Sequence, residues 1–139
     1  MIVLDTNVIS ALMLRDPDKK VIDWLDDQAP ESIWTTSISI FEIRFGLEIL
    51  EDGIKKQNLK DAFAHAVSEE FAGRILDFDN PAAKEAAILA AERRRSGRPV
   101  EFRDTMICGI ARARRASVAT RNVKHFQGTK VRIINPWED

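Results

Sequence analysis

Short apolar runs alternate with amphipathic stretches along the whole chain. Five β-prone runs predict strands, at residues 2–4, 33–36, 74–77, 117–120 and 131–134. Between them, apolar residues recur at helical spacing in six segments, at residues 8–13, 18–28, 37–52, 54–71, 81–96 and 103–115. Strands that alternate with helices favour a mostly parallel sheet covered on both faces. The pattern therefore predicts an α/β fold, with a central sheet of about five strands.

The composition narrows the class of protein. The chain has 139 residues, of which 45% are hydrophobic and 31% charged, and its net charge is -1. We expect residues 1–139 to form a single folded domain, because disordered chains are less apolar and a second domain would not fit. The single cysteine, Cys108, excludes an intramolecular disulfide. The segment MIVLDTN does not resemble a signal peptide, and no apolar run approaches ~18 residues, so we expect a cytoplasmic protein without a membrane anchor.

The small net charge conceals an uneven distribution of charge. Residues 1–92 contain 9 Lys or Arg against 18 Asp or Glu, whereas residues 93–132 contain 12 against 2, and ten of those twelve are arginines. Guanidinium groups match phosphate with paired hydrogen bonds, so this segment favours a nucleic-acid partner. An acidic protein partner, or a solvated helix face for the run 93–95, would also explain it. The candidate nucleic-acid contacts are Arg93, Arg94, Arg95, Arg98, Arg112 and Arg115.

Three carboxylates lie where a parallel sheet places its ligands. In such sheets the binding crevice lies beyond the carboxyl ends of the strands. Asp5 follows the first predicted strand, Glu42 lies early in the helix after the second, and Asp104 begins the helix before the fourth. Each has a structural explanation too, because Asp5 and Asp104 could cap helices and Glu42 could interact with a helix dipole. Their predicted convergence at one end of the sheet favours a shared site.

Crowded carboxylates repel one another unless a cation neutralises them. Hard oxygen ligands suit Mg²⁺ or Mn²⁺, and such an ion can polarise a phosphodiester and activate a water molecule. Neither His65 nor His125 has a partner at ligand spacing, so the predicted site uses oxygen ligands alone. Together with the arginine-rich segment, this predicts metal-dependent hydrolysis of phosphodiester bonds.

Four segments resemble the PIN-domain family in order and spacing: IVLDTNVIS, SISIFEIRFGLEIL, RDTMICGIARARRASVATRNVKHF and the closing INPW. The similarity covers essentially the entire chain and is strongest to the VapC toxins of bacterial toxin–antitoxin pairs, in the FitB-like branch. It implies an α/β/α sandwich ribonuclease that uses Mg²⁺ or Mn²⁺. It also implies a homodimer that is inhibited by a small antitoxin, through which alone it binds DNA.

The resemblance also implies roles for individual residues. Asp5, Glu42 and Asp104 match the family's acidic metal site, and Thr6 and Asn7 match the polar pair that orients the first carboxylate.

The family's fourth motif is matched by Thr120, Arg121 and Asn122. Many relatives have an aspartate at the position of Asn122 or at that of His125, and this chain has neither. We therefore expect one firmly bound ion. Asn122 and Thr120 would position the attacking water or stabilise the carboxylates.

Two other functions remain compatible with the sequence. A phosphatase of the haloacid-dehalogenase type would use Asp5 as its nucleophile, but such enzymes favour a second aspartate at the position of Asn7. A catalytically degenerate member of the family would bind nucleic acid or its antitoxin without cleaving. The incomplete fourth motif keeps this alternative open.

Overall fold

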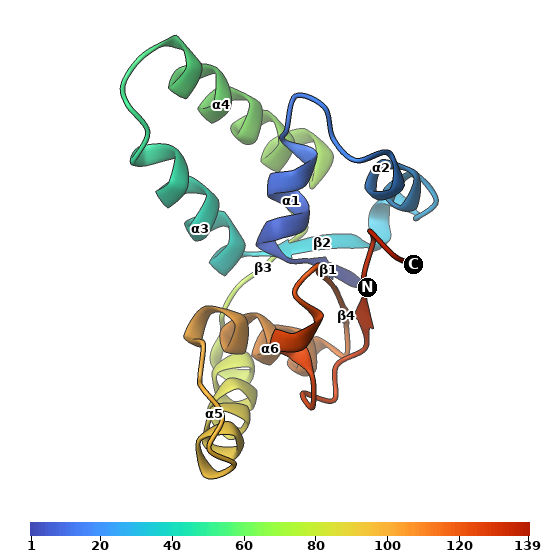
Figure 1. Cartoon of the computed structure of the whole chain (residues 1–139), viewed down its shortest axis with the longest axis vertical. Coiled ribbons are helices and arrows are strands. Elements are labelled where there is room, and N and C mark those ends of the chain that lie inside the picture. Colours follow the sequence, from blue (N-terminus) through green and yellow to red (C-terminus); the bar gives the residue numbers. More distant parts are fainter.

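The computed structural model describes residues 1–139 and contains one sheet with helices on both faces (Figure 1). The strands are β1 (Ile2–Leu4), β2 (Ile33–Thr36), β3 (Ile75–Leu76), β4 (Ser117–Ala119) and β5 (Ile133–Ile134). The α-helices are α1 (Thr6–Leu12), α2 (Lys19–Asp26), α3 (Ser37–Glu48), α4 (Ile54–His65), α5 (Asn80–Arg95) and α6 (Phe102–Arg114). The predicted α/β fold with five strands is confirmed.

All neighbouring strands are parallel, in the order β3-β2-β1-β4-β5. The chain builds the sheet outward from β1 in one direction through β2 and β3, and then resumes on the other side of β1 with β4 and β5. The strand order thus reverses between β1 and β4. A crevice at the carboxyl ends of two such strands is where open α/β sheets bind their ligands.

Alternating side chains on each central strand supply the two hydrophobic cores. Val3 and Val118 pack toward α5 and α6, whereas their neighbours Leu4 and Ala119 pack toward α1, α2, α3 and α4. Because both faces of these strands are buried, their sequences are continuously apolar rather than alternating. No helix combines the length and the apolar character needed to cross a membrane.

Helix α5 packs closely against the middle of α6. A Cβ atom at Gly109 would lie 2.6 Å from the carbonyl oxygen of Ala82 and 2.7 Å from Cβ of Ala86. Only glycine therefore permits this approach of the two helices. The packing matters for function because α6 carries Asp104 in its first turn.

The structure departs from the predicted elements mainly at turns. The predicted helix 54–71 ends at His65 and continues as a π-helical turn, η2 (Ala66–Glu70). Two 3₁₀ turns, η1 (Pro30–Ser32) and η3 (Val123–Phe126), were not predicted. The turn η3 follows β4 closely and brings His125 beside α6.

Candidate active site

Asp5 is held at the carboxyl edge of the sheet by three hydrogen-bond donors. It directly follows β1 and is only 3% exposed. Its Oδ1 accepts a hydrogen bond from the backbone N of Thr6 at 2.8 Å, and its Oδ2 accepts from Asn7 Nδ2 at 3.0 Å and from Thr120 Oγ1 at 2.8 Å. Thr120 follows β4, so the ends of two adjacent strands hold one carboxylate.

The residues of the fourth motif fold against this carboxylate. Asn7 Oδ1 accepts a hydrogen bond from the backbone N of Arg121 at 3.1 Å, and Thr120 Oγ1 accepts one from the backbone N of Asn122 at 3.0 Å. The guanidinium of Arg121 lies over the ring of Trp137, 4.9 Å from its centre. The side chain of Asn122 is exposed and makes no hydrogen bond, so its proposed role in catalysis stays a prediction.

Glu42 lies in the second turn of α3, facing Thr6. Its Oε1 accepts a hydrogen bond from Thr6 Oγ1 at 3.0 Å, and its Oε2 lies 3.5 Å from Nη1 of Arg103. The same Thr6 hydroxyl lies 2.9 Å from Oγ of the fully buried Ser39. Partial burial raises the pKa of Glu42 above its usual value, although Thr6 and Arg103 oppose that rise.

Asp104 is the third residue of α6 and does not cap that helix. The cap is Glu101, whose carboxylate accepts from the backbone N of Arg103 at 3.2 Å. The Oδ2 atom of Asp104 instead lies 2.7 Å from Nδ1 of His125. Nothing in the sequence indicated this contact, which forms because η3 turns the ring of His125 toward α6.

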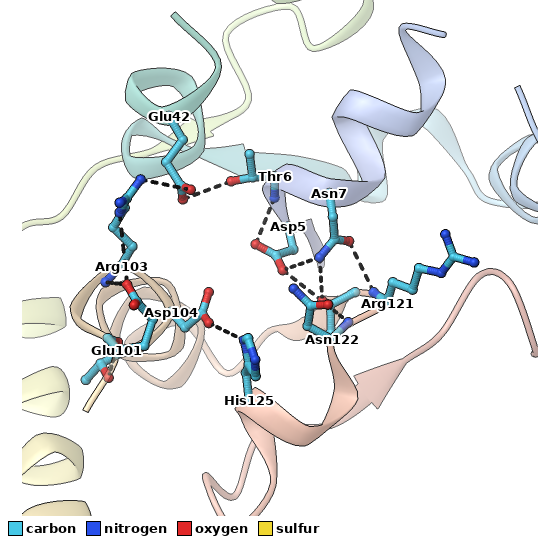
Figure 2. A network of polar contacts seen from close by, with 12 residues as sticks. Asp5, Thr6, Asn7, Glu42, Glu101, Arg103, Asp104, Arg121, Asn122 and His125 are labelled. Atoms are coloured by element: carbon cyan, nitrogen blue, oxygen red, sulfur yellow. Dashed lines mark hydrogen bonds and ion pairs between the residues drawn. The ribbon is translucent and has the colours of Figure 1, made fainter. Parts of the chain in front are cut away.

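These three carboxylates line one cavity of about 460 Å³, which we call the acidic pocket (Figure 2). Thr6, Asn7, Arg121 and Asn122 also line it, so four segments far apart in the sequence converge there. Burial raises the pKa of Asp5 to about 6, and the nearby charges of Asp104 and Glu42 add to that rise. The pocket thus carries an excess of negative charge.

The donor set of the acidic pocket fits a hard divalent cation. Carboxylate oxygens are the preferred ligands of Mg²⁺ and Mn²⁺, and a cation would offset the burial of Asp5 and its repulsion by Asp104 and Glu42, which raise its pKa. As they stand, no three acidic, histidine or cysteine side chains lie close enough to share an ion. Glu42 is held by Thr6 and Arg103, and Asp104 by His125. Ordered water between an ion and some of these carboxylates would be consistent with this spacing.

The candidate arginines lie in different parts of the molecule. Arg93 and Arg98 lie beside η3, near Asp104, whereas Arg94 and Arg95 are exposed at the end of α5. The remaining two, Arg112 and Arg115, line a separate cavity near the amino ends of β4 and β5, opposite Asp5. Arg112 is also paired there with Glu85 at 3.1 Å. The structure therefore does not bring this last pair to the acidic pocket.

Sequence reasoning missed three side chains of this site. Arg103 pairs with Glu42, His125 contacts Asp104, and Trp137 lies under Arg121 and lines the acidic pocket. The available signal was that each of them lies within one of the four family-like segments. Their positions in those segments did not indicate a role in the site. The contacts of His125 and Trp137 depend on the turns after β4 and β5, and that of Arg103 depends on the packing of α6 near α3.

A model of the PIN domain family matches residues 2–130 of the chain. Curated relatives match over nearly the whole chain. VapC ribonuclease Y4jK from Sinorhizobium fredii is 38% identical over 138 residues, covering 99% of each chain. Toxin FitB from Neisseria gonorrhoeae is 35% identical over 139 residues, covering 100% of each.

Solved structures agree with these matches. The crystal structure of FitAcB from Neisseria gonorrhoeae superposes with a TM-score of 0.92 at 34% identity, covering 100% of both chains. A structure of FitAB bound to an IR36 DNA fragment gives the same TM-score and identity, covering 100% of this chain and 97% of that one. The chain belongs to the PIN-domain family, and the resemblance to its VapC and FitB toxins is confirmed.

Proposed function

We propose that the chain is a metal-dependent endoribonuclease and the toxin of a type II toxin–antitoxin pair. The observation that carries this proposal is the acidic pocket, in which Asp5, Glu42 and Asp104 line one cavity although they come from three distant segments. The kinship with a VapC ribonuclease supports RNA as the substrate. The raised pKa of Asp5 supports a bound cation, because burial and the neighbouring carboxylates disfavour its negative charge more than its hydrogen-bond donors favour it.

In the proposed mechanism Asp5 and Asp104 hold Mg²⁺ or Mn²⁺, directly or through water, and Glu42 completes the site. When bound, the ion would supply positive charge that polarises the phosphodiester and favours ionisation of the attacking water. Thr6, Asn7 and Thr120 fix both oxygens of Asp5, so this ligand needs no reorganisation. Glu42 would orient the attacking water or accept its proton, and its raised pKa makes it a stronger base than an ordinary glutamate.

The partners follow from the same kinship. We propose that a small antitoxin binds the chain and that the complex, rather than the toxin alone, binds DNA, as the FitAB structure with DNA suggests. We also propose a homodimer. Phe41 and Phe45 on α3 and Ile49 just after it are 60%, 52% and 69% exposed, and a second copy would bury them.

An aspartyl phosphatase is less compatible with the geometry. Both oxygens of Asp5 are engaged by hydrogen-bond donors, and the residue two positions on, Asn7, donates to Asp5 through Nδ2. An amide in that role cannot act as a general acid. A degenerate binding module remains the second candidate, because Asn122 contributes no carboxylate.

Cleavage of RNA by purified variants tests the proposal. Asp5→Asn and Asp104→Asn should each lower cleavage in Mn²⁺ by about 10³-fold or more, because each removes a charge that the transition state requires. Asp61→Asn is the control, since Asp61 is exposed on α4 and contacts only Gln57. Parental cleavage rates in the first two variants would refute the assignment. Absent cleavage in the parent, with no Mn²⁺ binding by calorimetry and intact RNA affinity, would favour the binding module.

A further inference from the structure

A second cavity, of about 390 Å³, lies between the end of α5 and the turn η3. We call it the basic pocket, after the side chains of Arg93, Arg98 and Lys124 that line it. His125 and Glu101 also face this cavity. It borders the acidic pocket directly, because His125 lines the basic pocket and contacts Asp104, which lines the acidic one.

The three cations of the basic pocket have no carboxylate partner within 4 Å. Neighbouring arginines of the same segment do, since Arg112 pairs with Glu85 and Arg114 with Asp79. The one acid at the pocket, Glu101, caps α6 and lies 4.0 Å from Arg103 rather than pairing with a cation of the pocket. Positive charge is therefore concentrated and uncompensated in a concave surface, which suits an anion.

Backbone structure places these cations rather than leaving them on mobile tails. Helix α5 ends at Arg95, and the φ of +70° at Gly97, just beyond the helix, lets the backbone N of Arg98 donate to the carbonyl oxygen of Arg93 at 2.9 Å. The guanidinium of Arg93 in turn donates to the carbonyl oxygen of His125. A Cβ at position 128 would lie 3.3 Å from Nη1 of Arg98, so Gly128 leaves room for that guanidinium.

We propose that the basic pocket binds a backbone phosphate of the RNA, adjacent to the phosphodiester held at the acidic pocket. This rests on the proposed function, since it takes RNA as the bound substrate. Guanidinium and ammonium groups both bind phosphate, and the pocket offers two of the first and one of the second. Of the six candidate arginines, it assigns this contact to Arg93 and Arg98, and it adds Lys124.

Binding of RNA without cleavage tests the proposal. The probe is a fluorescein-labelled, unstructured RNA of mixed sequence, titrated with the full-length chain in EDTA at several salt concentrations. The test variant is Arg98→Gln/Lys124→Gln, which spares Arg93 because that residue also braces η3. The matched control is Arg94→Gln/Arg95→Gln, which removes the same charge from exposed positions at the end of α5. Thermal melts of both variants are the check that each of them folds.

The test variant should bind RNA about tenfold more weakly. Its log–log salt slope should be shallower by roughly 0.7, because one phosphate of the RNA is no longer neutralised. The control should bind about twofold more weakly, since its charges act only at a distance. Equal losses in both variants would indicate a diffuse basic surface and would overturn the proposal, as would an unchanged affinity in the test variant.

Cleavage assays distinguish failure of the basic-pocket proposal from failure of the proposed function. With Mn²⁺, Arg98→Gln/Lys124→Gln should raise KM about tenfold and leave kcat within about threefold. Full activity in Asp5→Asn would refute the ribonuclease assignment but would not alter the binding measured in EDTA. A normal KM in the test variant, beside inactive Asp5→Asn, would refute the basic pocket alone.

Discussion

The acidic pocket has two halves that are built differently. In the strand half, which consists of Asp5, Asn7 and Thr120, neutral donors hold a buried carboxylate at the ends of β1 and β4. In the helix half, Glu42 and Asp104 are held by Arg103 and His125, from α6 and η3. Neutral donors orient a charge without cancelling it, whereas a cation such as Arg103 compensates it. The strand half therefore leaves a negative charge that a cation would neutralise, whereas the helix half already offsets part of its own negative charge.

Removing a donor from the strand half should have the largest effect. Thr120→Val keeps the shape of a fully buried side chain but removes its hydrogen bond to Asp5, and it leaves Asn7 Nδ2 without its second acceptor. We expect RNA cleavage to fall about 100-fold and the free energy of unfolding to fall by roughly 1–3 kcal/mol. The measurements are kcat/KM and urea unfolding.

Thr35→Val is the matched control, because Thr35 is also fully buried in the sheet but donates to the carbonyl oxygen of Leu4. It should lose stability while retaining most of its activity. Equal loss of activity in the two variants would mean that packing, rather than orientation of Asp5, is what the threonine provides.

The uncompensated charge of Asp5 should also appear in the pH dependence of stability without metal. Its pKa is raised from 3.8 to about 6 in the folded chain, so the folded state binds the proton more tightly than the unfolded state. The stabilisation this provides is complete below pH 3.8 and is lost as pH rises through 6. Asp5→Asn does not titrate, so its stability relative to the parent should rise by roughly 2 kcal/mol between pH 4 and pH 8.

Urea unfolding in EDTA at these two pH values measures that difference. Above pH 6, added Mn²⁺ should stabilise the parent and not the variant, so that the difference in stability between them changes in favour of the parent. If the free energies of unfolding of the parent and the variant changed with pH in parallel, ionisation of Asp5 would not destabilise the folded chain. The strand half would then not be the part of the pocket that requires a cation.

The helix half should tolerate substitution better. His125→Ala removes the contact that orients Asp104 from a side chain that is about half exposed, and we expect a loss of about tenfold in kcat/KM. His125→Asn retains a donor near the position of Nδ1 and should recover activity to within about threefold of the parent. Calorimetry with Mn²⁺ gives a second readout, because misorienting Asp104 should weaken metal binding. No recovery in His125→Asn would assign the imidazole a role other than positioning.

The two halves also differ in how far the sequence predicts them. Asp5 follows an apolar run directly, so the end of a strand identifies it. Thr120 was predicted as the last residue of its strand and was assigned to the site through the family resemblance, but the parallel sheet places it beside Asp5 for the same reason. The order of elements was predictable for the same reason, since buried strands and amphipathic helices have different periods. The strand half is thus a consequence of the sheet.

The contacts of the helix half were not predictable in this way. The contact of His125 with Asp104 depends on the 3₁₀ turn η3, and that of Arg103 with Glu42 depends on the distance between α3 and α6. That distance is set by side-chain packing, as the close approach of α5 and α6 at Gly109 illustrates. Local sequence specifies neither the turn nor the packing, and the charge-compensating partners were therefore missed.

The smallest effect should come from Arg103, whose side chain is 50% exposed and lies 3.5 Å from Glu42. Its charge lowers the pKa of Glu42, so Arg103→Gln should raise that pKa and move the acidic limb of the kcat/KM profile to higher pH. At neutral pH we expect a loss of only about twofold to threefold, because an exposed ion pair is weak. Arg103→Lys keeps the charge and should keep the parental profile. A loss in Arg103→Gln as large as that in His125→Ala, without a shift of the limb, would instead place Arg103 in contact with the RNA, and the two halves would then differ in substrate binding rather than in charge compensation.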